Sequence, residues 1–154
     1  MINWNHVKYF SADEFADPNY PGSGELINGK LVYMLEQSRR DTFLYDPKRG
    51  WPMLIHYQAG GAVDVEGSWG HSKNSYHLLR NEAKAVDFHF DVDIPIKEQI
   101  YFVLKCGFGG VGIYYNVWRY NGVLLPVAFH VDIRPKTEFL IWKCYKKGVY
   151  EYVL

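Results

Sequence analysis

Histidines and carboxylates are concentrated in the stretch from residue 70 to residue 91. This stretch contains three histidines, and Asp87 interrupts a short apolar run. Burying an unpaired carboxylate costs on the order of several kcal/mol, so Asp87 should be paired or bound to a cation. Imidazole nitrogen and carboxylate oxygen are both common zinc ligands. His77 and Asp87 are therefore candidate ligands of one metal site.

A second segment, 129–134 (FHVDIR), alternates apolar and polar residues. Because side chains alternate along a strand, His130, Asp132 and Arg134 should share one face. One interpretation is the solvated face of an edge strand. Two such segments in a small chain favour a shared site instead, with His130 as the third ligand.

Three short segments contain these candidate ligands: Ser75-Tyr76-His77, Ala85-Val86-Asp87 and His130-Val131-Asp132. They resemble the Ser-x-His, Ala-x-Asp and His-x-Asp segments of the zinc D-alanyl-D-alanine carboxypeptidase family. That family includes D-Ala-D-Ala carboxypeptidases and dipeptidases, murein endopeptidases and phage L-alanyl-D-glutamate endolysins. Residues 9–15 and 109–115 resemble its entry helix and its glycine-rich strand, so the resemblance covers nearly the whole chain.

The resemblance implies a zinc ion on His77, Asp87 and His130, with water in the fourth position. It also implies a zinc-dependent peptidase that hydrolyses a bond next to a D-amino acid in peptidoglycan stem peptides. Such an enzyme is a D,D-carboxypeptidase or an endopeptidase of the endolysin kind. The partner would be the stem peptide itself.

Two features depart from the family pattern. Nine residues separate His77 from Asp87, where the family usually has six, and Arg80 stands where a glycine is usual. A short insertion explains this spacing and leaves His71 as a less favoured rival for the first ligand. Gln58 occupies the place of an arginine that many relatives carry, and it can donate only a neutral hydrogen bond.

The catalytic residues expected from the sequence are Asp132, Gln58 and Arg134. Asp132 would share the face of His130 and could take the proton of the attacking water, or it could instead orient a histidine ligand. Arg134 would hold a substrate carboxylate or neutralise Asp132.

A long polar loop over residues 59–76 is expected to carry substrate-binding residues, because long loops in compact domains are often functional. Ser75 and His71 would approach the substrate from this loop. Trp69 would form a wall beside the substrate or simply anchor the loop. His89, which alternates with Asp87, should lie at the rim of the site.

Length and charge indicate a single domain over residues 1–154, without bulk attraction to a polyanion. The chain has 17 basic and 17 acidic residues, so a nucleic-acid partner is not expected. Aromatic residues make up 18% of the sequence. They could fill a small core with large side chains or line a groove for a glycan or a peptide.

The start of the chain shows no basic region followed by an apolar core, and no run approaches membrane-spanning length. We therefore expect cytoplasmic synthesis of a monomer without a signal peptide or membrane contact. Action on the cell wall would follow release or export by another route.

The predicted fold is α+β, with N-terminal helices packed on a C-terminal antiparallel sheet and the zinc site in a cleft over the sheet. Ser11 and Glu14 suggest a capping box, and Asn121-Gly122 a tight hairpin. The expected helices span 28–43 and begin again near Asp93, and the expected strands span 53–57, 108–115, 117–120, 123–125, 129–133, 139–145 and 149–153.

Two other functional classes stay open at this point. One is a non-catalytic module that keeps the fold, and with it a peptidoglycan or zinc site. The other is an aromatic-rich glycan-binding domain without metal.

Overall fold

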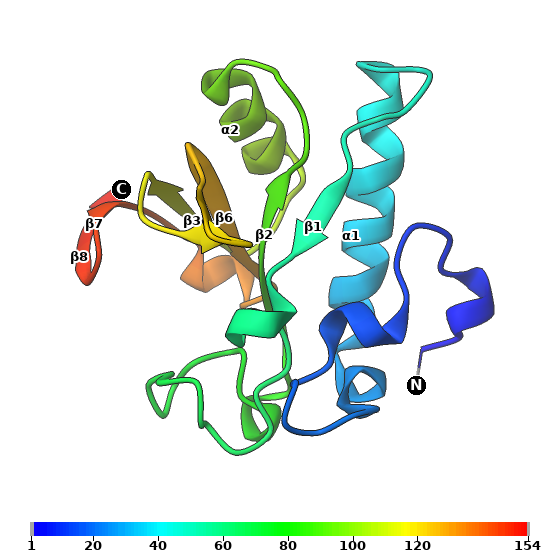
Figure 1. Cartoon of the computed structure of the whole chain (residues 1–154), viewed down its shortest axis with the longest axis vertical. Coiled ribbons are helices and arrows are strands. Elements are labelled where there is room, and N and C mark those ends of the chain that lie inside the picture. The colour runs from blue at the N-terminus through cyan, green and yellow to red at the C-terminus, as the bar shows by residue number, and fades with distance from the viewer. Residues whose placement is uncertain (1, 154) are drawn as a thin grey trace.

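Residues 2–153, which the structure describes, form an α+β fold with two α-helices and a mixed six-stranded sheet (Figure 1). The coordinates are a computed structural model. The helices are α1 (Gly29–Asp41) and α2 (Ile96–Lys105). The strands of the large sheet, in spatial order, are β1 (Met53–Ile55), β2 (Ala85–Phe90), β6 (Val127–Asp132), β3 (Gly110–Tyr115), β7 (Leu140–Lys146) and β8 (Val149–Val153).

The sheet is not purely antiparallel, contrary to the sequence-based prediction. Strands β3 and β7 run parallel, whereas the other neighbouring pairs are antiparallel. After β6 the chain passes residues 133–139 and enters β7 on the far side of β3, so β7 does not pair with β6. The alternation of apolar residues predicts that a segment is a strand, but it does not predict which strand this segment pairs with.

Local signals place the helices close to their predicted bounds. The Asn28 side chain caps α1 by accepting from the Lys30 N–H, and a 3-10 turn follows the helix at Thr42–Leu44. The capping box is confirmed, since the Glu14 carboxylate accepts from the Ser11 N–H at 2.7 Å. It opens a four-residue 3-10 helix.

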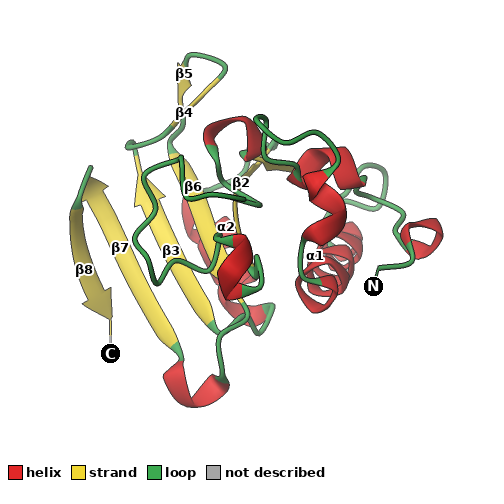
Figure 2. Ribbon diagram, turned by 90° about the horizontal axis from the view of Figure 1, so that it is seen from below, coloured by secondary structure: helices red, strands yellow, loops and turns green. Residues whose placement is uncertain are grey.

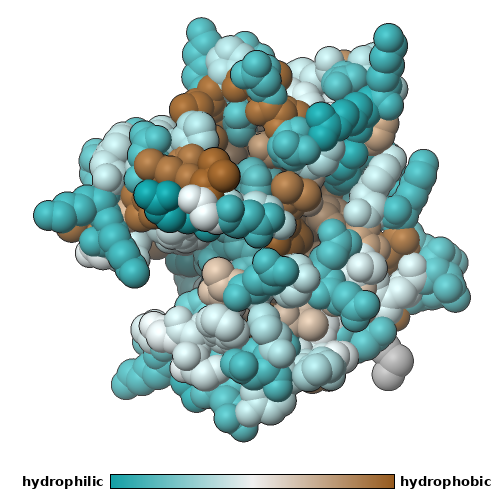
Figure 3. All heavy atoms as spheres, viewed as in Figure 1, coloured by the Kyte–Doolittle hydropathy of each residue, from teal (hydrophilic) through white to brown (hydrophobic). Residues whose placement is uncertain are grey.

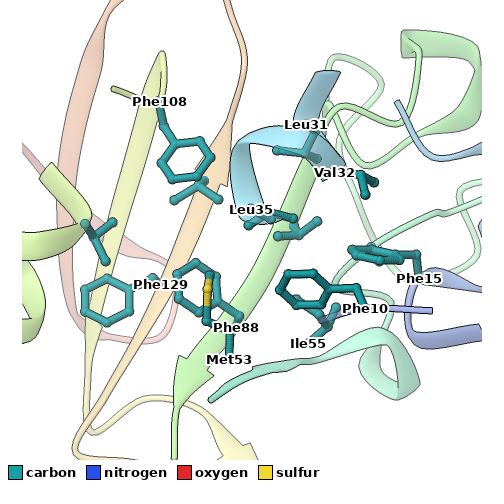
Figure 4. Close-up of a cluster of buried hydrophobic side chains, with 14 of the residues drawn as sticks. Phe10, Phe15, Leu31, Val32, Leu35, Met53, Ile55, Phe88, Phe108 and Phe129 are labelled. Atoms are coloured by element: carbon teal, nitrogen blue, oxygen red, sulfur yellow. The ribbon is translucent and has the colours of Figure 1, made fainter. Parts of the chain in front are cut away.

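One face of the sheet packs against both helices and forms the core. Leu31, Val32 and Leu35 of α1 belong to the same buried cluster as the sheet residues Phe88 and Phe129 (Figure 4). Phe102 and Val103 of α2 join this cluster. Because side chains alternate, residues such as Asp87 and His130 lie on the opposite face.

Strand β8 forms the outer edge of the sheet, away from α1 (Figure 2). The predicted Asn121-Gly122 hairpin joins β4 (Arg119–Tyr120) to β5 (Val123–Leu124), and both turn residues have positive φ, +48° and +79°. Within residues 2–153 neither helix has the length and apolar character to cross a membrane.

Candidate metal centre

The pairing of strands brings two of the candidate ligands together. Asp87 on β2 is the cross-strand partner of His130 on β6, and both lie on the sheet face opposite the core. The next partner of His130 is Gly112 on β3. A side chain at Gly112 would collide with the indole of Trp142, so its absence leaves room for this ring beside the histidine.

The third candidate, His77, arrives from the loop before β2. The backbone N–H of Lys84 donates to the carbonyl of Tyr76, and the Asn81 amide donates to the Ser75 carbonyl at 2.8 Å. Glu82 and Ala83 adopt positive φ values of 74° and 44°. The nine residues between His77 and Asp87 thus fold into a compact turn that returns the chain to the sheet.

The three candidate ligand atoms lie close to one another. His130 Nδ1 lies 2.8 Å from Asp87 Oδ1 and 3.1 Å from His77 Nε2, and His77 Nε2 lies 3.3 Å from Asp87 Oδ1. Ligands of a tetrahedral zinc ion at about 2.0–2.1 Å would be roughly 3.3 Å apart. The His77, Asp87 and His130 group can therefore hold a metal ion. Three protein ligands would leave the fourth position of a tetrahedral ion to water or substrate.

The opposite nitrogen of each histidine is also fixed. His77 Nδ1 donates to the Ala62 carbonyl at 3.1 Å, and His130 Nε2 lies 3.2 Å from Asp132 Oδ2. Such bonds fix the tautomer and ring orientation of a metal-bound histidine. His77 Nε2 and His130 Nδ1 are then the nitrogens that face Asp87.

This geometry favours one of the two roles considered for Asp132. Its carboxylate is fully buried, faces the His130 nitrogen that points away from the ligand group, and receives two N–H groups of the Arg134 side chain. A carboxylate held in this way is suited to orienting His130, because its oxygens already accept N–H groups from Arg134. Arg134 neutralises Asp132, as one of its two expected roles requires.

Electrostatics around the group are dominated by charge pairing. Burial alone would raise the pKa of Asp87, but the imidazoles of His77 and His130 hold it well below its usual range. Burial alone would lower the pKa of His130, yet its bonds with Asp132 and Asp87 raise it to about 9. Without metal, His130 is thus a cation between two carboxylates.

A cavity of about 710 Å³ opens beside the group. In the space-filling view, the surface is hollowed between the side that carries β7 and β8 and the loop at the bottom (Figure 3). Loop residues line one side and aromatic rings of the sheet line the other. The rings of this side are those of Tyr114, Trp142, Tyr150 and Tyr152 on the sheet and of Trp118 between β3 and β4, and Tyr76 lies among the loop residues.

Of the expected substrate-binding residues, Ser75 and His71 line this cavity. Trp69 does not line it and serves as an anchor, since its indole N–H donates to Asp17 at 3.1 Å. Gln58 is exposed, contacts the hydroxyl of Tyr57 and is not a cavity residue, contrary to the expected catalytic position. The cause is that β1 ends at Ile55 and the chain turns into a 3-10 helix.

His89 also lies away from the ligand group. Its Nδ1 is 2.9 Å from Nε2 of His56, and both rings contact Tyr120. Burial lowers the pKa of His56 to about 4, so it is neutral at pH 7. This pair is buried, and neither histidine lines the cavity.

Sequence reasoning missed Asp64. This fully buried carboxylate accepts from the backbone N–H groups of Gly67 and Ser68 and lies 2.8 Å from Nδ1 of His71. The His71 ring stacks on His77 with 4.5 Å between centroids. An acid seven residues before a histidine in a polar loop was the only available signal, and that spacing is common by chance.

Comparisons of this chain with protein-family models, with curated proteins and with solved structures found no match. The resemblance seen in the short motifs therefore has no independent support. The geometry of the group and its cavity supports a proposal about the chemistry of the site, whereas a proposal about the substrate rests on the motifs.

We expect metal affinity to rise with pH. Binding at His130 Nδ1 displaces a proton whose pKa is about 9, so the apparent affinity should rise about tenfold per pH unit between pH 7 and 9, and less steeply above. Competition with a chromogenic chelator would measure this slope. A constant affinity over that range would contradict the arrangement.

Asp132→Asn separates the two roles of this residue. An orienting role predicts metal affinity lower by about 10- to 100-fold, because the bond that fixes His130 is weakened. A base would instead leave affinity intact and remove turnover. Zinc titration of the folded variant decides between them, with circular dichroism as the check on folding.

Proposed function

We propose that this protein is a zinc-dependent peptidase that hydrolyses a bond next to a D-amino acid in peptidoglycan stem peptides. The observation that carries the proposal is the convergence of His77 Nε2, Asp87 Oδ1 and His130 Nδ1 within 2.8–3.3 Å at the wall of a cavity. Two histidines, one carboxylate and an open position are typical of catalytic zinc. The murein substrate comes from the resemblance of the motifs.

The donor set and its spacing select among metals. Two imidazoles and one carboxylate suit zinc, whereas calcium prefers six to eight oxygen ligands at longer distances. When bound, zinc would lower the pKa of a water molecule toward neutrality and polarise the peptide carbonyl. Asp132 and Ala62 hold the outer nitrogens of the two histidines, so the protein fixes both rings before a metal arrives.

His71 is the residue best placed to move the proton. The buried carboxylate of Asp64 accepts from His71 Nδ1, which leaves Nε2 with its lone pair, and the ring stacks on His77 beside the cavity. In this scheme Nε2 takes a proton from the attacking water and returns it to the leaving amine. Asp64 keeps the tautomer and stabilises the charged ring, as in other carboxylate–histidine pairs.

The direct test is digestion of purified peptidoglycan. The protein is incubated with and without a chelator, zinc is then restored, and released fragments are identified by mass spectrometry. Products that vanish with the chelator and return with zinc support the proposal, and their masses identify the bond. Bound zinc without products from several wall types would indicate a non-catalytic module.

His71→Gln should lower kcat by about 10²- to 10⁴-fold and leave zinc content unchanged, because His71 moves a proton and is not a ligand. Measured zinc stoichiometry separates this from the alternative in which His71 is the first ligand. His6→Gln serves as the control, because His6 is an exposed histidine far from His71 in the sequence. Full activity in His71→Gln would rule out the proton-transfer role.

A further inference from the structure

A straight row of cross-strand partners leads from the ligand group to the edge of the sheet. His130 pairs with Gly112, Gly112 with Trp142, and Trp142 with Tyr152 on β8. Directly opposite residues lie on the same face, so this row continues the face that carries Asp87. The candidate metal centre and the edge strand therefore share one surface.

The outer end of this surface consists of two exposed tyrosines. Tyr150 and Tyr152 are 48% and 61% exposed, alternate on β8 and line the same cavity as His77 and His130. Alternate residues in a strand are about 6.8 Å apart, so the rings form a platform about two sugar rings long. Behind them, Trp142 is buried and its indole N–H donates to the Tyr114 hydroxyl at 3.2 Å.

The charge of the aromatic side of the cavity limits the class of ligand that it can bind. Tyr114, Trp118, Trp142, Tyr150 and Tyr152 are uncharged side chains at neutral pH. Lys147 is the cation at this end of the cavity lining. Aromatic faces with neutral rims suit the apolar C–H faces of pyranose rings better than the charged groups of a peptide.

We propose that Tyr150 and Tyr152 form a saccharide-stacking subsite that holds the glycan of a stem peptide while the peptide reaches the metal centre. This inference rests on the proposed function. Three inter-strand steps of about 4.8 Å separate His130 from Tyr152, roughly 14 Å in total. An extended peptide covers that distance with about four residues.

This spacing sets which bond reaches the metal centre. The sugar of peptidoglycan is joined to the first residue of the stem. With the sugar on the tyrosines, the bond beyond the fourth residue lies at the ligand group. A glycan-linked stem should therefore be cut at its terminal D,D bond, and a bond one residue from the sugar should be a poor substrate.

The test compares one pentapeptide in two forms, free and attached to the N-acetylglucosaminyl-N-acetylmuramyl disaccharide. For the zinc-loaded wild type we expect kcat/KM to be at least about tenfold higher for the glycan-linked form, mainly through a lower KM. Tyr152→Ala should bring this ratio close to one, and Tyr152→Phe should keep it, because the phenyl face still stacks. Tyr101→Ala, an equally exposed tyrosine (61%) on α2, should leave the ratio unchanged.

A ratio near one in the wild type, or an unchanged ratio in Tyr152→Ala, would overturn the subsite. Binding of the peptide-free disaccharide, followed by tryptophan fluorescence, separates this proposal from the proposed function. Binding that Tyr152→Ala abolishes supports the subsite even if neither peptide is cut. Failure of the wild type to bind the disaccharide at millimolar concentration would count against it in either case.

Discussion

The structure depends on the pairing of one carboxylate with two imidazoles. Asp87 lies in the middle of β2, and the residues on either side of it in this strand are fully buried. Its Oδ1 is 2.8 Å from His130 Nδ1 and 3.3 Å from His77 Nε2. A carboxylate in this position without partners would strongly disfavour the fold. The strand that completes the core is therefore stable only if the ligand group also forms, which couples the assembly of the core to that of the site.

The loop over residues 60–76 is held in place by two buried acids. Asp17 accepts from the Val65 backbone and from the Trp69 indole, and Asp64 accepts from backbone groups and from His71. An ordered loop without regular structure needs such partners, because its backbone has no strand or helix to pair with. The N-terminal segment thus fixes one wall of the cavity, although it contributes no residue to the cavity lining.

Much of the fold could be predicted because its signals are local. The Asn28 cap, the Asn121-Gly122 turn and the alternation around His130 each depend on a few neighbouring residues. The parallel pairing of β3 with β7 depends on the path of residues 133–139 across the end of the sheet, and no local sequence pattern predicts that path.

For the site, residue type predicted that His130 and Asp87 would belong to one shared site, and the structure places them as cross-strand partners. The predicted position of Gln58 at the site was wrong because strand β1 was predicted to extend two residues too far. Asp64 and the tyrosines of β8 were missed because their relation to the site arises only from long-range packing.

The edge position of β8 has a further consequence for the chain in concentrated solution. An outermost strand presents unpaired backbone groups that can template pairing with another molecule, and exposed Val149, Tyr150 and Tyr152 add apolar surface. Glu151 and Lys147 place charges of both signs along this edge, which disfavours flat stacking of copies. The edge strand that lines the cavity thus also presents a surface for self-association, which the charges of Glu151 and Lys147 oppose.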